Sequence, residues 1–305
     1  MQALRRTFGH EAEERETMSL AVNQAANANA ARPVSPGVSD ASELKFPELL
    51  GRGAPVNARD FEAHGTALHR SLAYGAALIG LVLLTLSTMG IGLVALVLAP
   101  MFDFFLRRRM LAQIKGTSLE VGPNQLPEIH ACAKAYAERL GLKEVPQIYI
   151  VEGNVVNAAA QRIGSRHVVH LVDDIVWGAL KAGDPNALAF IIAHELAHHA
   201  LGHTGALHTY LAMSYRRLSR LDELSCDAVA LQLVNDRETA YNGLIMLMVG
   251  PQLLPYVNRK QLLAQAEQVA QDRATKKAER AHTHPFVARR LWELRNAKLA
   301  SSRPT

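Results

Sequence analysis

Cysteine is scarce in this sequence. Only Cys132 and Cys226 occur among 305 residues, and they lie far apart along the chain. Two cysteines are too few for a disulfide framework and are typical of a protein from a reducing compartment.

Nucleic-acid-binding motifs are also lacking, although the chain is basic, with a net charge of +5 and a pI of about 9.3. Its Lys and Arg residues gather in two segments, 107–115 and 259–280. Aromatic residues, 6% of the chain, do not alternate with these basic residues. We therefore interpret the charge as solvated surface and membrane-topology signal, and expect no nucleic-acid partner.

Hydrophobic periodicity is missing from the N-terminal part. Residues 1 to about 45 are rich in Ala, Asn, Glu, Ser and Pro. Such a composition buries too little apolar surface to offset the entropy of ordering. The sequence predicts a disordered tail over residues 1–70.

Charged residues are absent between Leu72 and Met101. This run exceeds the roughly 20 residues that cross a bilayer as a helix. It predicts a transmembrane anchor over residues 71–106 and makes the lipid bilayer a partner. Two forms are open: one tilted span, or a hairpin of two short helices that breaks near Ser87, Thr88, Gly90 and Gly92.

The flanking charges predict the orientation of this anchor. Arg107, Arg108, Arg109 and Lys115 follow the apolar run closely, whereas only Arg59 and Arg70 precede it at a similar distance. Basic residues favour the cytoplasmic side. We expect the domain that follows to be cytoplasmic.

Residues 116–298 are expected to form one globular domain. An amphipathic helix is predicted over residues 127–140, and strands over 147–151 and 167–172, which are rich in β-branched residues. From Asp184 onward the pattern is helical almost to the end of the chain. The expected fold class is α+β, mostly helical, with a small β-sheet.

The segment His194-Glu195-Leu196-Ala197-His198 carries the clearest chemistry. Residues four apart share one face of a helix, so both imidazoles can reach one tetrahedral zinc ion, with Glu195 beside the water to be activated. Asp184 and Pro185 predict the start of this helix. Its remaining residues are mostly apolar, so it should be buried, and burying two histidines and a glutamate without a partner is costly.

A catalytic zinc needs a third protein ligand. A third histidine six residues after His198 is excluded, because Thr204 occupies that position. Glu223 is the better candidate, with Asp227 one helical turn later to accept a hydrogen bond from a ligand imidazole. Asp222 is a competing ligand. We interpret His199, His203 and His208 as surface or packing residues, and Cys226 as a small core residue.

Three segments, HELAHHALGH, SRLDELSCD and THPFVARR, occur in this order. Together with residues 116–158, they resemble the membrane-anchored gluzincins of the HtpX and CAAX-protease type. The resemblance implies a zincin-like metallopeptidase domain with one zinc ion per chain, held by His194, His198 and Glu223. It also implies Glu195 as catalytic base, Asp227 as the carboxylate that orients a ligand imidazole, and His284 and Arg290 facing the cleft to polarise the substrate carbonyl.

The resemblance points to a membrane-bound endopeptidase that acts on polypeptides. CAAX-type members have many spans, whereas this chain has one or two, so quality control of unfolded or damaged membrane proteins is the nearer analogy. We expect it in a bacterial inner membrane. A substrate would lie extended along an edge strand near Asn154, Asn157 and Ala158. The alternatives are a catalytically inactive zinc-binding chaperone, and a scaffold that recruits partners through residues 259–280.

Overall fold

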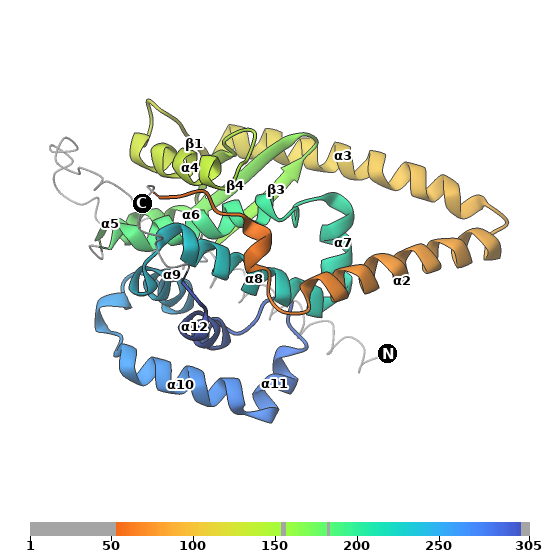
Figure 1. The fold of residues 1–305 in the computed structure, drawn as a ribbon. Coiled ribbons are helices and arrows are strands. Elements are labelled where there is room, and N and C mark those ends of the chain that lie inside the picture. The colour runs from red at the N-terminus through yellow and green to blue at the C-terminus, as the bar shows by residue number, and fades with distance from the viewer. Residues whose placement is uncertain (1–52, 154–156, 182–183, 300–305) are drawn as a thin grey trace, which may run out of the picture. The chain divides into compact units, whose positions relative to one another are not determined.

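A small mixed sheet and the helices packed on it form the body of the protein (Figure 1). The computed structural model describes residues 53–153, 157–181 and 184–299, so residues 1–52 of the predicted tail, and Asn154, lie outside the described residues. The strands are β1 (Leu119–Val121), β2 (Gln147–Val151), β3 (Ala158–Ile163) and β4 (Arg166–Val172). Their order is β1-β2-β4-β3, with β2 and β4 parallel and the other two pairs antiparallel. In the described sheet, β3 is therefore an edge strand.

The structure confirms two predicted strands and the first predicted helix. β2 and β4 match residues 147–151 and 167–172, and helix α4 spans Pro127–Arg139. β1 was not predicted, and β3 was expected only as an edge strand near Ala158, without bounds. β3 begins with three alanines, which have little intrinsic preference for strands. Its pairing with β4 supplies the stabilisation that its own sequence lacks.

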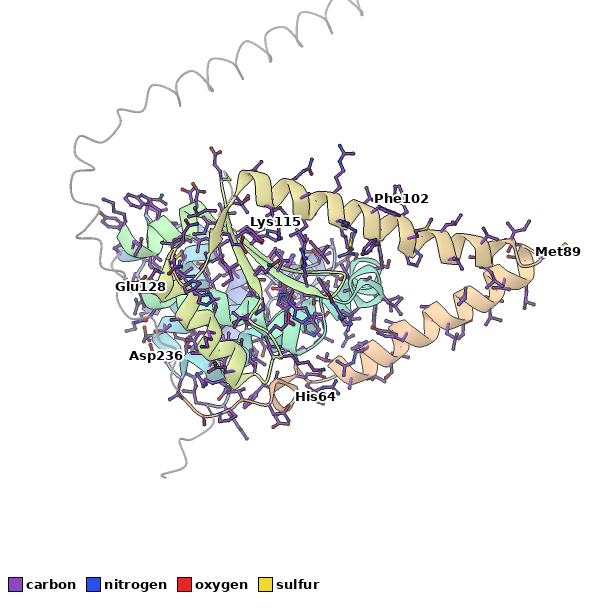
Figure 2. The ribbon with its side chains drawn as sticks, turned by 90° about the horizontal axis from the view of Figure 1, so that it is seen from above. His64, Met89, Phe102, Lys115, Glu128 and Asp236 are labelled. Atoms are coloured by element: carbon purple, nitrogen blue, oxygen red, sulfur yellow. The ribbon has the colours of Figure 1, made fainter. Side chains whose placement is uncertain are left out.

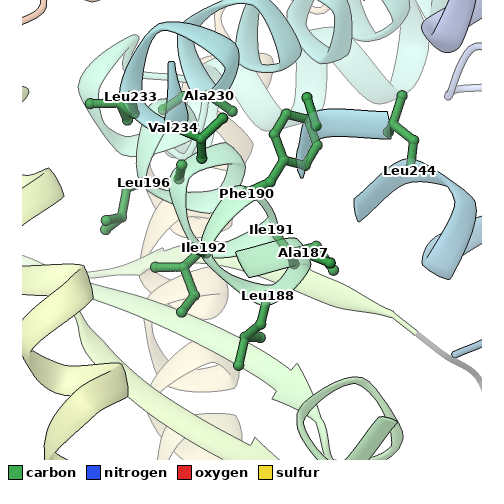
Figure 3. Close-up of a cluster of buried hydrophobic side chains, with 14 of the residues drawn as sticks. Ala187, Leu188, Phe190, Ile191, Ile192, Leu196, Ala230, Leu233, Val234 and Leu244 are labelled. Atoms are coloured by element: carbon green, nitrogen blue, oxygen red, sulfur yellow. The ribbon is translucent and has the colours of Figure 1, made fainter. Parts of the chain in front are cut away.

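Helix α6 (Pro185–Ala200) runs through the core, as its apolar sequence predicts. The Asp184 carboxylate caps it by accepting a 3.2 Å hydrogen bond from the Ala187 amide, and Pro185 occupies the first turn. Helices α8 (Arg216–Val234) and α9 (Arg237–Val249) pack against it. Figure 3 shows side chains of all three helices meeting in one apolar cluster.

The contact between α9 and α6 depends on a glycine. A Cβ atom added at Gly243 would lie only 2.5 Å from Cδ1 of Phe190, which is fully buried on α6. The absence of a side chain therefore lets the two helices approach closely.

The other helices complete a mostly helical α+β fold, as predicted. The 259–280 segment forms two helices, since Asp272 ends the first and caps the second by accepting a 2.6 Å hydrogen bond from the Thr275 amide. The first of these packs against the C-terminal helix. The remaining elements are α5 (Asp173–Lys181), α7 (Ala206–Ser214), η2 (Leu254–Tyr256), α10 (Arg259–Gln271), α11 (Arg273–Glu279) and α12 (Val287–Asn296).

The long apolar run folds as a helical hairpin, the second of the two predicted forms. Helix α2 (Thr66–Ser87) and helix α3 (Ile91–Thr117) meet at a turn in which Met89 and Gly90 have positive φ angles of 49° and 91°. Met89, 95% exposed, lies at the tip (Figure 2). Among the described residues, α2 alone is long and apolar enough to cross a membrane. Only 6% of its most apolar window is buried, so it is not a core helix.

The predicted boundary of the disordered tail at residue 70 needs correction. Helix η1 (Ala58–Phe61) and the start of α2 precede that residue. Ala58 is buried, and the Ala63 amide donates a 2.8 Å hydrogen bond to the Ser225 hydroxyl on α8. These contacts hold the segment on the body of the protein, although its own sequence has little periodicity.

Candidate active site

The three predicted metal ligands meet between α6 and α8. Nε2 of His194 is 3.5 Å from one carboxylate oxygen of Glu223, and Nε2 of His198 is 3.6 Å from the other. The ligand atoms all lie within 4.8 Å of one another. Helical spacing places both imidazoles on one face of α6, and the packing of α8 brings the carboxylate to them.

A buried carboxylate and an arginine support His194 from behind. Oδ1 of Asp227 is 3.0 Å from Nδ1 of His194. Arg290 on α12 donates two hydrogen bonds to Asp227, of 2.7 Å from Nε and 2.6 Å from Nη2. A carboxylate on the outer nitrogen of a metal-binding histidine fixes its tautomer and raises its basicity. Asp227 therefore stands where the spacing predicts.

The position of Arg290 differs from the expected one. Its side chain borders the cavity, but it is only 8% exposed, and its third nitrogen, Nη1, lies 3.4 Å from Glu223. Two of its nitrogens bond Asp227, so the guanidinium is occupied by a carboxylate and is not free to hold a substrate carbonyl. The expected direct contact with substrate does not fit this geometry.

The donor set fits zinc, since it consists of two imidazole nitrogens and one carboxylate. Burial alone would lower the pKa of His194, but the hydrogen bonds to Asp227 and Glu223 outweigh burial and raise that pKa to about 9. Burial likewise works against ionised Glu223, yet the three histidines around it hold its pKa well below the usual range. The surroundings thus stabilise positive charge at this point, which a divalent cation would supply.

Glu195 lies in the same cavity and is 6% exposed. Burial raises the pKa of its carboxyl group, while the neighbouring His194 and His198 act in the opposite direction. A buried carboxylate with a raised pKa holds a proton more tightly than an exposed one. The residue can therefore accept a proton and pass it on.

The cavity measures about 380 Å³ and is lined on one side by the start of β3. Asn157 and Ala158, two of the three predicted substrate-binding residues, line it together with Ala159 and Ala160. Because β3 pairs with β4 alone in the described sheet, its other edge borders the cavity. An extended peptide could add there as a further strand.

His284 is at the mouth of the cavity. Its side chain is 67% exposed, and its Nδ1 is 3.0 Å from Oε1 of Glu223. The hydrogen bond to Glu223 raises the pKa of His284. Its position at the rim agrees with a residue that faces the cleft.

Sequence reasoning missed a second group of buried polar residues. His203, His208 and Asp222 lie together beside the first site, and each is at most 6% exposed. Of the two interpretations offered for these histidines, surface or packing residues, their burial excludes the first. Asp222 faces them and not the first site. The repeated spacing of five residues from His198 to His203 to His208 was the available signal. A helical repeat does not carry this spacing across residues 201–205, because a turn interrupts the helix there.

Two other residues behave as packing residues. The ring of His199 stacks on His167 at 4.5 Å, and its Nε2 is 3.3 Å from the Val168 carbonyl oxygen, which ties α6 to the sheet. Cys226 is fully buried, and burial raises the pKa of its thiol well above the usual value. It remains a protonated core residue, as predicted.

Two family models match the chain over this region. Residues 123–215 match the model of peptidase family M48, and residues 185–301 match that of peptidase U49. The two matches overlap on α6 with its paired histidines, and the second extends across Glu223 and Arg290. These matches support an M48-type metallopeptidase domain in this part of the chain.

The chain is also similar to the plastoglobule-localized metallopeptidase 48 of Arabidopsis thaliana, a chloroplastic protein. The two are 26% identical over 210 residues, which represent 62% of this chain and 56% of the relative. The chain thus spans little more than half the length of that relative. No solved structure matches it.

Proposed function

We propose that this chain is a zinc-dependent endopeptidase held at a membrane by the α2–α3 hairpin. The observation that carries the proposal is the cavity in which His194, His198 and Glu223 converge beside Glu195 and an open strand edge. One zinc ion would be held by the two imidazole Nε2 atoms and the Glu223 carboxylate. When bound, it supplies Lewis acidity to the substrate carbonyl and to the attacking water.

The peptide is proposed to bind in extended form along β3, with Asn157 and Ala158 beside the scissile bond. Backbone pairing reads little of the side-chain sequence, which suits unfolded or damaged membrane proteins as substrates. Asn154 belongs to the same proposed segment.

Glu195 is the proposed base. It removes a proton from water as the oxygen bonds to the carbonyl carbon, and then gives this proton to the nitrogen as the C–N bond breaks. His284, at the rim, is proposed to donate a hydrogen bond to the oxyanion that develops, an interaction worth roughly 3 kcal/mol. Arg290 holds Asp227, and Asp227 holds His194, so both act by positioning.

The decisive comparison is between the purified wild-type protein and Glu195→Gln. We expect the variant to bind zinc as the wild type does and to cleave an unfolded casein roughly 10²- to 10⁴-fold more slowly. Glu144→Gln, at an exposed position outside the cavity, is the matched control and should retain full activity. Equal cleavage by wild type and Glu195→Gln would exclude the mechanism. Zinc binding without cleavage by either would favour the inactive chaperone or scaffold.

Membrane attachment is supported by the exposed apolar side chains along α2 and the first half of α3. Helix α2 has 22 residues, about 33 Å at 1.5 Å per residue, enough for a hydrocarbon core of about 30 Å. Both ends of a hairpin emerge on one side, and the basic residues that flank it support the proposal that this side is cytoplasmic. In a bacterium this would be the inner membrane.

Cysteine labelling tests the attachment, because the two native cysteines are buried. In proteoliposomes with the domain outside, Met89→Cys should resist a membrane-impermeant maleimide, while Glu144→Cys reacts. Equal labelling of both would show that the hairpin does not enter the bilayer.

A further inference from the structure

A second cluster of metal-binding side chains lies next to the proposed zinc site and shares no residue with it. His203 comes from the turn after α6, His208 from α7 and Asp222 from α8. Their relative exposures are 6%, 5% and 3%. Asp222 and Glu223 are consecutive on α8, where the helix turns by about 100° per residue, so their side chains face different sites.

Asp222 makes a hydrogen bond with His208 and approaches His203 closely without forming one. Nε2 of His203 is 3.2 Å from Oδ1 of Asp222, yet in the described structure each of these two buried atoms lacks a hydrogen-bond partner. Nε2 of His208 is 2.8 Å from the other oxygen, Oδ2. Two ligand atoms that each lie about 2.1 Å from a tetrahedral ion are separated by about 3.4 Å. The 3.2 Å separation between His203 and Asp222 is close to this value, and the 2.8 Å separation between His208 and Asp222 would lengthen toward it when a cation binds.

The charge of Asp222 also needs a partner. Its carboxylate is buried between two imidazoles, and burying an anion without compensation is costly. Arg70 is near enough to interact with it. The Arg70 guanidinium is, however, engaged in two hydrogen bonds of 2.9 and 3.2 Å with Glu62. A divalent cation between Asp222 and the two histidines would supply the charge.

We propose that His203, His208 and Asp222 bind a second divalent cation of the zinc type. The set of two nitrogens and one oxygen is one that zinc accepts. A cavity of about 560 Å³ borders all three residues and leaves room for a water ligand in the fourth position.

The second ion would stabilise the position of α6, the helix that carries His194 and His198. It would join α7 and α8 to the turn that ends α6, and Nδ1 of His203 lies 3.3 Å from Nδ1 of His198. The second ion would thereby fix the turn that directly follows the helix carrying His198. Without an ion, the same residues would form only a chain of polar contacts from Asp222 through His203 to His198, and metal content separates the two arrangements.

Metal stoichiometry tests the proposal. The full-length protein in detergent micelles is stripped with a chelator, saturated with zinc, freed of weakly bound metal and analysed by mass spectrometry. We expect two ions for the wild type, one for His208→Gln and one for His194→Ala. His69→Gln, a histidine outside the cluster whose ring accepts or donates a 2.6 Å hydrogen bond to Tyr215, is the matched control and should retain two.

A wild type with a single ion, lost in His194→Ala but kept in His208→Gln, would overturn the second site and leave the proposed peptidase intact. Loss of the ion in His208→Gln alone, with His194→Ala unaffected, would instead support the second site and count against the catalytic one. Anomalous scattering at the zinc edge from crystals of the wild type should show two peaks, one of them between His208 and Asp222. The His208→Gln crystals should show one peak, which also establishes that this variant folds.

Discussion

The buried ion pair between Arg290 and Asp227 leads to a quantitative prediction about stability. Both side chains are almost fully buried, at 8% and 2% exposure, and two hydrogen bonds join them. Arg290→Leu leaves the Asp227 charge without its main partner. Breaking such a pair from one side costs about 3–5 kcal/mol of the free energy of unfolding.

The loss can be measured as a shift in melting temperature. A domain of this size loses roughly 2–4 °C for each kcal/mol, so Arg290→Leu should lower Tm by roughly 6–20 °C. Differential scanning fluorimetry in detergent, with zinc in excess for every variant, provides the measurement.

Arg289→Leu is a matched control on the same helix. Arg289 pairs with Glu293 at 2.7 Å, but these side chains are 27% and 34% exposed, and such surface pairs are worth about 0–1 kcal/mol. Its Tm should therefore fall by no more than about 4 °C. Equal shifts for the two variants would refute the reasoning. The double variant Asp227→Asn/Arg290→Leu should be less destabilised than the sum of its single changes, because the unpaired charge is removed.

Three further predictions concern the site and its support. Asp227→Asn removes the acceptor on Nδ1 of His194 and should weaken zinc binding roughly 10- to 100-fold in a competition titration, with unchanged affinity counting against the support role. Gly243→Ala places a Cβ atom against the buried Phe190 ring and should lower stability by roughly 1–3 kcal/mol in denaturant unfolding, whereas Gly116→Ala, where the added atom meets nothing within 4 Å, should not. Chelation should abolish casein cleavage and added zinc should restore it; cleavage that survives complete removal of metal would contradict a metallopeptidase.

Much of the fold could be predicted from local sequence patterns. The start of α6 follows from Asp184 and Pro185, because capping and proline geometry act within one helical turn. The placement of His194 and His198 on one face follows equally from the helical repeat. Strands β2 and β4 were visible because their residues are β-branched.

Contacts between segments that are far apart in the sequence could not be predicted from such patterns. β3 is a strand only because β4 pairs with it, and its alanines give no local sign of this. Arg290 is separated from Asp227 by 63 residues, and its commitment to that carboxylate depends on how α12 packs against α8 and α9.

By itself, the sequence determined the paired histidines with Glu195, the candidate third ligand on a following helix, and a long apolar segment that the body of the protein does not bury. These are consequences of residue type and short-range periodicity. The tertiary structure alone decided that the apolar segment is a hairpin, that β3 borders the cavity, and that His203, His208 and Asp222 meet beside the candidate active site. Those features depend on which helices and strands pack together, and packing is set by the whole core and by no single segment.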